Sequence, residues 1–403
     1  MGTRVKEIQL AGRQQMKKVK VLSVFGTRPE AIKMAPLIKE IEKDESLESL
    51  VCVTAQHRDM LDQVMDIFDL KANVDLDIMQ KSQTLTDITT RALIGLEGAF
   101  KALKPDLVLV HGDTTTTFAA GLAAFYSKIA VGHVEAGLRT YDKYQPFPEE
   151  MNRKLTTALA DLYFAPTPYS RNNLLKENIP EKNIFVTGNT AIDCLSLTIS
   201  DEYEFMEKSL NHINFEGKRI ITMTAHRREN IGEPLEAICK AVKRIVEDNE
   251  DIEVIYPVHS NPAVRETAER ILDGNKRIHL LNPLDIKDMH NLMNKSYFVM
   301  TDSGGLQEEV PSMGKPVLVL RNVTERPEGV EAGTLKIAGV EEDKIYEMAS
   351  TLLHDEKIYS EMAIAKNPFG DGFASRRIVE AIKYHFGIIN ERPLDYTVNQ
   401  LEN

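Results

Sequence analysis

The chain has 403 residues, of which 42% are hydrophobic and 27% charged, a composition typical of a globular protein and a length that favours two domains. Its formal net charge of −12, without long basic runs, argues against nucleic acid as the main partner, although a few local cations suffice for an anionic small ligand. No apolar run is long enough to cross a bilayer. Residues 1–15 lack the apolar core of a signal peptide, and we interpret them as an extension or tag outside the fold.

The three cysteines, Cys52, Cys194 and Cys239, lie far apart in apolar contexts. Their spacing matches neither a disulfide framework nor a zinc site. We therefore expect a reducing cytoplasm and no structural metal.

Short β-branched runs alternate with helical patterns from Val19 onward, which is typical of βαβ units and parallel sheets. The runs are continuously apolar, as expected when helices cover both faces of a sheet. The expected strands are 19–25, 50–55, 106–111, 129–134, 161–165, 183–186, 219–224, 252–257, 277–281, 296–301 and 315–320.

A charged stretch without strand pattern, 199–217, separates the two halves, and we place the boundary near 187–190. The expected fold class is α/β, with two Rossmann-like doubly wound domains over 16–188 and 189–371. In such a fold the ligand lies in a cleft, at the carboxyl ends of the strands. The loops that follow the strands are therefore the places to look for chemistry.

The loop after the first strand combines Gly26, which permits a tight turn, with Pro29, which suits a first helical turn. Arg28 and Lys33 add positive charge, and a helix N-terminus with such charge favours an anion. The stretch lacks both the dinucleotide GxGxxG and the Walker lysine patterns. An ordinary turn with a solvated Arg28 is an equally good interpretation from this loop alone.

Two further loops of the first half allow a simple structural explanation. Gln56 follows the second strand as a candidate helix cap. Asp113 follows the strand 106–111, and it would serve either as N-cap of a helix from Thr114 or as a catalytic carboxylate. Under the second interpretation, the threonine hydroxyls after Asp113 would orient its carboxylate.

More carboxylates follow the strand 129–134. Glu135 caps nothing obvious, whereas Glu149 and Glu150 open the helix that carries Arg153, where acids complement the helix dipole. Three carboxylates at neighbouring strand ends would repel one another, so at least one pKa should be raised. Such a separation of pKa values allows one group to act as acid and another as base.

The second half presents cations and glycines at its strand ends. The backbone N–H groups of a glycine-rich helix start can approach phosphate oxygens closely, and an acid one turn later can accept from a ribose diol. The residues concerned are His226, Arg227, Arg228, His259, Ser303, Gly304, Gly305, Glu309, Arg321 and Arg326. Carboxylates on one domain and a phosphate-type cradle on the other predict an enzyme that acts on a nucleotide-linked substrate.

Motifs over residues 17–387 together resemble the bacterial non-hydrolysing UDP-N-acetylglucosamine 2-epimerases. The matching stretches are FGTRPEAIKMAP, TAQHR, HGDTTTT, HVEAGLRT, PFPEEMNR, GNTAID, HRREN, PVHSNP, TDSGGLQEE, ERPEG and NPFGDG. The resemblance implies a fold like GT-B glycosyltransferases, with a C-terminal helix, 372–387, crossing back to the first domain. It also implies UDP-GlcNAc, UDP-ManNAc and UDP as ligands, often a homodimer, ManNAc supply for cell-surface polysaccharide, and no nicotinamide or other cofactor.

The resemblance also assigns roles. It implies Asp113, Glu135 and Glu149 as acid–base groups, without deciding which removes and which returns the proton, and His226 near the diphosphate. The positions that match UDP or substrate contacts are Arg28, Lys33, Arg153, Ser303, Gly304, Gly305, Glu309 and Arg326.

Three rival functions remain at this stage. A retaining GT-B glycosyltransferase shares the fold but has little use for clustered carboxylates. A hydrolysing epimerase would release free ManNAc. A catalytically silent UDP-sugar-binding regulator would have no need to retain the acidic positions.

Many bacterial members of this family bind a second UDP-GlcNAc that activates turnover, and the positions matching its contacts are Gln56, Glu149, Arg227 and His259. Asp59 and Ser82 stand where a Gln and an Arg may occur, and loss of an arginine weakens anion binding. We therefore expect activation that persists but is weaker. Initial rates with UDP-ManNAc, with and without trace UDP-GlcNAc, test this expectation, and rates indifferent to UDP-GlcNAc would contradict it.

Overall fold

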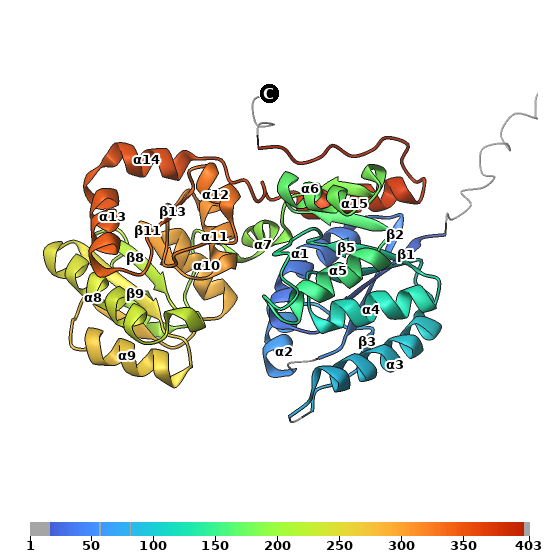
Figure 1. Ribbon diagram of the computed structural model, residues 1–403, viewed down its shortest axis with the longest axis horizontal. Coiled ribbons are helices and arrows are strands. Elements are labelled where there is room, and N and C mark those ends of the chain that lie inside the picture. The colour runs from blue at the N-terminus through green and yellow to red at the C-terminus, as the bar shows by residue number, and fades with distance from the viewer. Residues whose placement is uncertain (1–16, 56–57, 81, 399–403) are drawn as a thin grey trace, which may run out of the picture. The chain divides into compact units, whose positions relative to one another are not determined.

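The computed structural model describes residues 17–55, 58–80 and 82–398, and in this part of the chain thirteen strands form two sheets (Figure 1). The paired strands run parallel, as the sequence predicts. The first sheet has the order β3-β2-β1-β4-β5-β6-β7. Its strands are β1 Val19–Phe25, β2 Leu47–Val53, β3 Val74–Asp75, β4 Leu107–His111, β5 Ala130–Val134, β6 Leu162–Ala165 and β7 Ile184–Val186.

The second sheet has the order β10-β9-β8-β11-β12-β13. Its strands are β8 Arg219–Thr224, β9 Ile252–Pro257, β10 Ile278–Leu281, β11 Phe298–Thr301, β12 Val317–Val319 and β13 Leu335–Ile337. All eleven strands predicted from the sequence are present, and the predicted fold class is confirmed. The two strands that the sequence analysis missed, β3 and β13, are two and three residues long and close the edges of their sheets.

Helices connect nearly all consecutive strands. Those of the first half are α1 Arg28–Lys43, α2 Arg58–Ile67, α3 Leu85–Leu103, α4 Thr115–Tyr126, α5 Glu149–Leu159, α6 Pro168–Lys176 and α7 Thr190–Thr198. Those of the second half are α8 Glu233–Asp248, α9 Pro262–Leu272, α10 Ile286–Lys295, α11 Gly304–Glu309, α12 Pro327–Glu331, α13 Glu342–His354, α14 Glu356–Ile364 and α15 Ala374–His385. No helix in the described ranges is long and apolar enough to cross a membrane.

The chain divides into two compact units. The first comprises the chain up to Phe164 together with Asn173–Phe185 and Arg376–Leu394, and the second holds Ala165–Asn172, Val186–Ser375 and the chain from Asp395. Helix α15 begins in the second unit, where Asp193 accepts hydrogen bonds from its first two backbone N–H groups, those of Ala374 and Ser375, and continues in the first.

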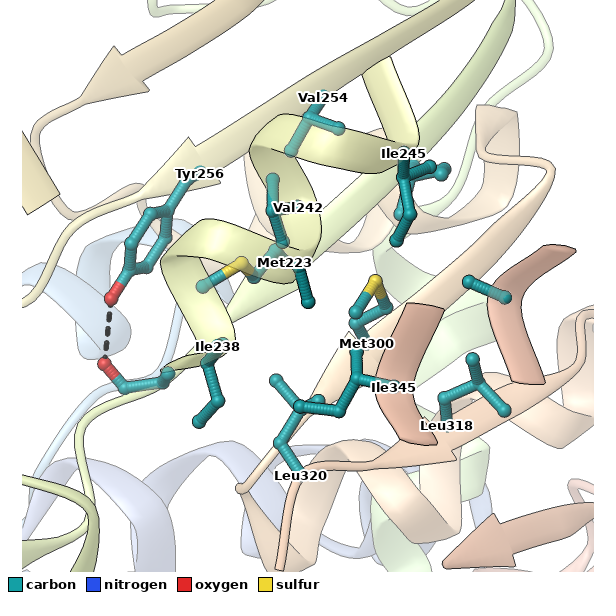
Figure 2. Close-up of a cluster of buried hydrophobic side chains, with 14 of the residues drawn as sticks. Met223, Ile238, Val242, Ile245, Val254, Tyr256, Met300, Leu318, Leu320 and Ile345 are labelled. Carbon is teal, nitrogen blue, oxygen red and sulfur yellow. Dashed lines mark hydrogen bonds between the residues drawn. The ribbon is translucent and has the colours of Figure 1, made fainter. Parts of the chain in front are cut away.

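The core of the second unit shows why its strands read as continuous apolar runs. Met223, Val254, Met300 and Leu318, from four neighbouring strands, pack with residues of α8 and α13 and are all buried (Figure 2). Tyr256 of this cluster is also fully buried, and its hydroxyl donates to the backbone carbonyl of Ala225 at 2.8 Å. Burial on both faces of the sheet leaves no polar alternation for the sequence to display.

Each sheet has one point at which its strand order reverses, between β1 and β4 in the first and between β8 and β11 in the second. At such a point the two following connections leave toward opposite faces, and ligands of doubly wound proteins bind beside the strand ends there. The predicted loops after β1, β4, β8 and β11 therefore lie where this topology places a site.

Candidate functional site

A buried carboxylate joins the two loops at the switch point of the first sheet. Glu30 on α1 accepts from the backbone N–H groups of Gly26 and Thr27, at 3.1 and 2.9 Å, in the loop after β1. It also accepts from the hydroxyls of Thr114 and Thr117, at 2.7 and 3.2 Å, which follow β4. Glu30 is 2% exposed, so these donors replace its hydration. Glu30 was not predicted as a site residue, although Thr27 and Glu30 have the spacing of a capping box.

Close packing at this point explains the glycine in the loop after β1. A Cβ atom on Gly26 would lie 2.0 Å from Oγ1 of Thr54 and 2.8 Å from Oγ1 of Thr116. These two threonines follow β2 and open α4, and their hydroxyls are 3.0 Å apart. Only a residue without a side chain fits at position 26. The backbone after β1 is therefore packed closely against the residue after β2 and the start of α4.

The structure contradicts the capping interpretation of Asp113. The N-cap of α4 is Thr114, whose side chain accepts from the backbone N–H of Thr117. The hydroxyls of Thr114 and Thr117, which were expected to orient Asp113, are directed to Glu30.

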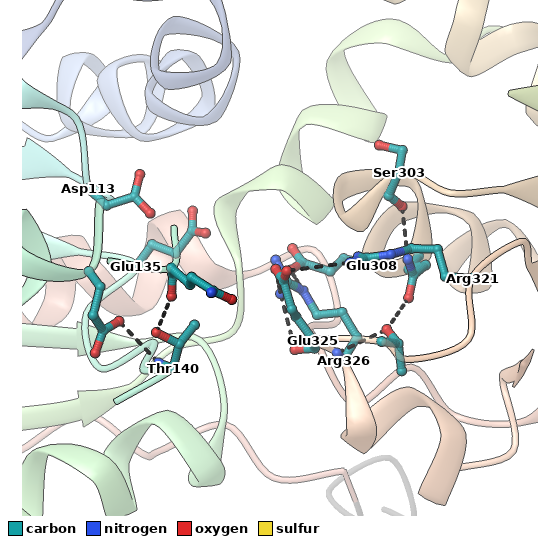
Figure 3. A network of polar contacts seen from close by, with 12 residues as sticks. Asp113, Glu135, Thr140, Ser303, Glu308, Arg321, Glu325 and Arg326 are labelled. Atoms are coloured by element: carbon teal, nitrogen blue, oxygen red, sulfur yellow. Dashed lines mark hydrogen bonds and ion pairs between the residues drawn. The ribbon is translucent and has the colours of Figure 1, made fainter. Parts of the chain in front are cut away.

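Arg153 on α5 holds the Asp113 carboxylate instead, and Figure 3 shows this carboxylate on the loop after β4. Nε and Nη2 of Arg153 lie 2.9 and 2.7 Å from Oδ2 of Asp113, and Nη1 lies 3.2 Å from Oε2 of Glu150. Arg153 was expected to contact substrate, and here it binds two carboxylates of its own unit.

Glu135 stands directly after β5, with a left-handed φ of 61° and a side chain 8% exposed. Its Oε2 lies 2.5 Å from Nζ of Lys33 and 3.0 Å from Nε2 of His111. Burial alone would raise the pKa of Glu135, but its contacts with Lys33 and His111 outweigh burial and hold the pKa well below the ordinary value. Glu135 is therefore not the carboxylate whose pKa mutual repulsion raises, and Lys33, predicted to meet an anion of the substrate, binds this carboxylate.

A second histidine secures the backbone before Asp113. Burial lowers the pKa of His133 to about 4, so its ring is neutral at neutral pH. Its Nε2 lies 2.7 Å from the carbonyl oxygen of Gly112, which requires the proton on Nε2. His133 therefore fixes the loop from within the sheet.

The two acids at the start of α5 differ in their surroundings. Glu150 is fully buried and accepts from the backbone N–H groups of Thr140 and Tyr141, so it organises the preceding loop. Figure 3 shows Thr140 in this loop. Glu149 is partly buried, and its Oε2 is buried without a hydrogen-bond partner among the described residues. A buried carboxylate oxygen without a donor is costly, and a bound ligand is one way to satisfy it.

The switch point of the second sheet also has a buried carboxylate, Asp302, directly after β11. It accepts from the backbone N–H groups of His226 and Arg227, at 2.7 and 2.8 Å, and from Nδ2 of Asn230 at 2.9 Å. Ser303 beside it was predicted as a site residue, but Asp302 was not. Burial lowers the pKa of His226, and the neighbouring His259 and Arg227 lower it further against the opposing effect of Asp302.

Two guanidinium groups border the glycine-rich turn after Asp302. A Cβ atom on Gly304 would stand 3.7 Å from Nη2 of Arg227 and 3.7 Å from Nη2 of Arg326. Arg326 is itself held by the buried Glu308, which also accepts from Nδ2 of Asn189 at 2.6 Å (Figure 3). The absence of a side chain at Gly304 leaves room for an anion to approach both arginines.

The other predicted positions of this unit differ in their environment. Ser303 is the N-cap residue of α11, where Gly305 follows Gly304. Glu309 is 8% exposed, and its Oε2 lies 3.3 Å from Nε2 of the fully buried His290. Nε of Arg321 lies 2.8 Å from Oε1 of Glu229.

In the first unit, Arg28 opens α1 half-buried, with no hydrogen bond or ion pair to any residue in the described ranges. Such a guanidinium can bind an anion without breaking an existing pair.

Of the positions matched to a second ligand site, Arg227 and His259 lie in the second unit and Glu149 in the first. The rings of His226 and His259 are stacked, with centroids 5.3 Å apart and planes 10° apart. Gln56 and the side chain of Asp59 lie outside the described residues. Ser82 has a left-handed φ of 59°.

Groups of three or more His, Cys, Asp or Glu that could hold a metal ion are absent from the residues that the structure describes. The buried carboxylates at the two switch points, Glu30 and Asp302, instead accept hydrogen bonds from backbone N–H groups and from neighbouring side chains.

Comparison with known proteins identifies the family. The family model described as UDP-N-acetylglucosamine 2-epimerase matches residues 39–383. The chain belongs to this family. The UDP-N-acetylglucosamine 2-epimerase of Bacillus subtilis is 58% identical over 382 residues, covering 95% of this chain and all of that protein.

Solved structures of family members are similar to this chain in fold and sequence. The MnaA–UDP co-structure of S. aureus has a TM-score of 0.83 and 54% identity, over 94% of this chain and 100% of that one. The UDP-GlcNAc 2-epimerase of Neisseria meningitidis, solved bound to UDP-GlcNAc, has a TM-score of 0.82 and 49% identity, over 90% of this chain and 99% of that one.

Proposed function

We propose that this epimerase interconverts UDP-GlcNAc and UDP-ManNAc at C2 of the sugar, without hydrolysis. Supporting this are the family and the ligands, UDP and UDP-GlcNAc, named for the S. aureus and Neisseria structures. The observation that carries the proposal is the placement of Asp113 and Glu135 after the paired ends of β4 and β5, where His111 is in register with Val134. Acid–base chemistry on both faces of one carbon needs at least two such groups.

The reaction itself explains why several groups are needed. The C2 proton is not acidic, because no carbonyl is next to it. In the proposed route, a base removes this proton while the C1–O bond to UDP breaks, giving 2-acetamidoglucal and UDP. UDP then adds back to C1, and an acid delivers a proton to the opposite face of C2, so atoms and charge balance.

The roles we propose follow from the two sets of contacts. Asp113, Glu135 and Glu149 act as the acid–base groups, with Arg28, Lys33 and Arg153 supporting them or the substrate. Glu135 is ionised at neutral pH because Lys33 and His111 lower its pKa. The second unit supplies His226, Arg227 and Arg326 to the departing diphosphate, which needs positive charge where negative charge develops. Ser303, Gly304 and Gly305 line the same turn, and Glu309 binds the ribose.

A deuterium experiment tests this function against its rivals. Incubation with UDP-GlcNAc in D2O should give deuterium at C2 of both recovered UDP-sugars, because the proton returned to C2 comes from a protein group in exchange with solvent. Free ManNAc would instead indicate a hydrolysing epimerase. Recovery of UDP-GlcNAc without deuterium would contradict the proposal and favour a glycosyltransferase or a silent binding protein. Mass spectrometry and NMR of the recovered sugars give the readout.

The substitution Asp113→Asn tests the first of the acid–base groups. Turnover should fall by about 10²–10⁴-fold, the usual contribution of a positioned acid–base group. UDP affinity, measured by calorimetry, should change little, because the proposed diphosphate contacts belong to the second unit.

The matched control for this substitution is Asp66→Asn, at an exposed position of α2 in the same unit, which should leave turnover unchanged. Near-normal turnover in Asp113→Asn would remove Asp113 from the mechanism.

We further propose a homodimer that joins through α3 and α4. Ile94 on α3 and Phe125 and Tyr126 on α4 are 72%, 59% and 67% exposed. Ile94 and Tyr126 line a hollow of about 830 Å³ together with Leu93 and Phe100. Exposed apolar groups of this size gathered in one place mark interaction surfaces.

The substitution Ile94→Glu should convert the dimer to a monomer, because it places a charge in the apolar contact. Light scattering should give a mass twice that of the 45.4 kDa chain for the unmodified protein and about one chain for the variant. Ile364→Glu is the control, since Ile364 is 80% exposed in the second unit. A monomeric unmodified protein, or an Ile364→Glu variant that dissociates equally, would contradict the proposal.

The compartment and the activation by UDP-GlcNAc remain predictions. A reducing cytoplasm is supported by the three cysteines, which are free and buried in the structure. Burial raises the pKa of Cys52 and of Cys239 to about 12, so these thiols are poor nucleophiles.

A further inference from the structure

The two oxygens of the Asp302 carboxylate have different partners. Oδ2 accepts all three hydrogen bonds from the loop after β8, namely those from His226 N, Arg227 N and Asn230 Nδ2. Oδ1 has no hydrogen bond among the described residues, although the side chain is fully buried. Its neighbour is Nδ1 of His226, at 3.3 Å.

An ionised carboxylate can only accept, so a buried Oδ1 requires a donor. Nδ1 of His226 meets this requirement when it carries the ring proton. In the neutral ring Nε2 is then unprotonated, because a neutral imidazole has one N–H. The arrangement resembles other carboxylate–histidine pairs in which the acid selects the tautomer.

The other groups around the ring favour its neutral form in the absence of ligand. His259 stacks on His226, and its own Nδ1 accepts from the backbone N–H of Asn261 at 3.1 Å. Arg227 is adjacent to His226 in sequence. His259 and Arg227 both oppose a positive charge on the His226 ring. The His226 side chain is 35% exposed, so a ligand has access to the ring.

We propose that Asp302 is a positioning residue that holds the proton of His226 on Nδ1, so that an anion arriving at Nε2 is bound by the imidazolium with uptake of a proton. The proposal rests on the proposed function, in which that anion is the diphosphate of the UDP-sugar. An unprotonated Nε2 facing a diphosphate would be repelled, whereas the imidazolium donates at both nitrogens, to Asp302 and to the ligand. The diphosphate offsets the repulsion from His259 and Arg227.

The first test reads the tautomer without any ligand. In protein labelled with ¹⁵N-histidine at about pH 8, the His226 signals are assigned by their loss in His226→Gln. Nδ1 should show the shift of a protonated nitrogen and Nε2 that of an unprotonated one. The reverse assignment would overturn the proposal, whether or not the protein is an epimerase.

The second test measures proton uptake on UDP binding, by calorimetry at one pH in buffers of different ionisation enthalpy. The unmodified protein should take up more protons than His226→Gln, by up to one. Asp302→Asn should match His226→Gln, because the amide keeps one oxygen for the backbone N–H groups and its NH2 donates to Nδ1, moving the ring proton to Nε2. Its affinity for UDP should fall roughly tenfold, the effect of weakening one charge-assisted hydrogen bond.

The matched control for this second test is Asp288→Asn. Asp288 is equally buried in the same unit and accepts from two backbone N–H groups, those of Met206 and Glu207. The Asp288→Asn variant should take up as many protons on UDP binding as the unmodified protein. Uptake in Asp302→Asn equal to that of the unmodified protein would overturn the proposal. Neither test uses turnover, so a negative deuterium experiment and a negative result here are separate outcomes.

Discussion

A doubly wound sheet places its site where two neighbouring strands send their connections in opposite directions, and this divergence leaves backbone N–H groups without partners in the interior. In both sheets of this protein one buried carboxylate satisfies them. Glu30 joins the loops after β1 and β4, and Asp302 joins those after β8 and β11. The positions of the candidate reactive groups depend on these two residues.

The charges in the first unit are arranged as separate pairs. Lys33 and His111 face Glu135, whereas Arg153 faces Asp113 and Glu150. Each carboxylate is therefore compensated locally, which is how several acids occupy neighbouring strand ends without strong mutual repulsion. Glu149 differs, since one oxygen is buried without a described partner.

The sheets and their order of elements could be predicted from the sequence because burial on both faces leaves continuous apolar runs, as in Leu107–His111. The edge strands β3 and β13 could not, because two or three residues carry no such pattern. The loop residues Asp113, Glu135 and His226 were predicted as candidates from their place after strands, and the structure places them in those loops. Asp302 was missed because its partners are distant in sequence. Glu30 has a local signal in its capping-box spacing with Thr27, but its contacts with Thr114 and Thr117 are distant in sequence. The helix cap was misplaced by one residue because Asp113 and Thr114 both suit it.

The hydrogen bonds of Glu30 also have a consequence for the order of folding. The two from Thr114 and Thr117 join residues 84 and 87 positions apart, so the carboxylate cannot gain all its partners until the chain through Thr117 has been synthesised. Contacts of such long sequence separation form slowly, after the loop-closure entropy has been overcome. During synthesis, we therefore expect the first unit to gain its ordered loops only together with the pairing of β1 and β4.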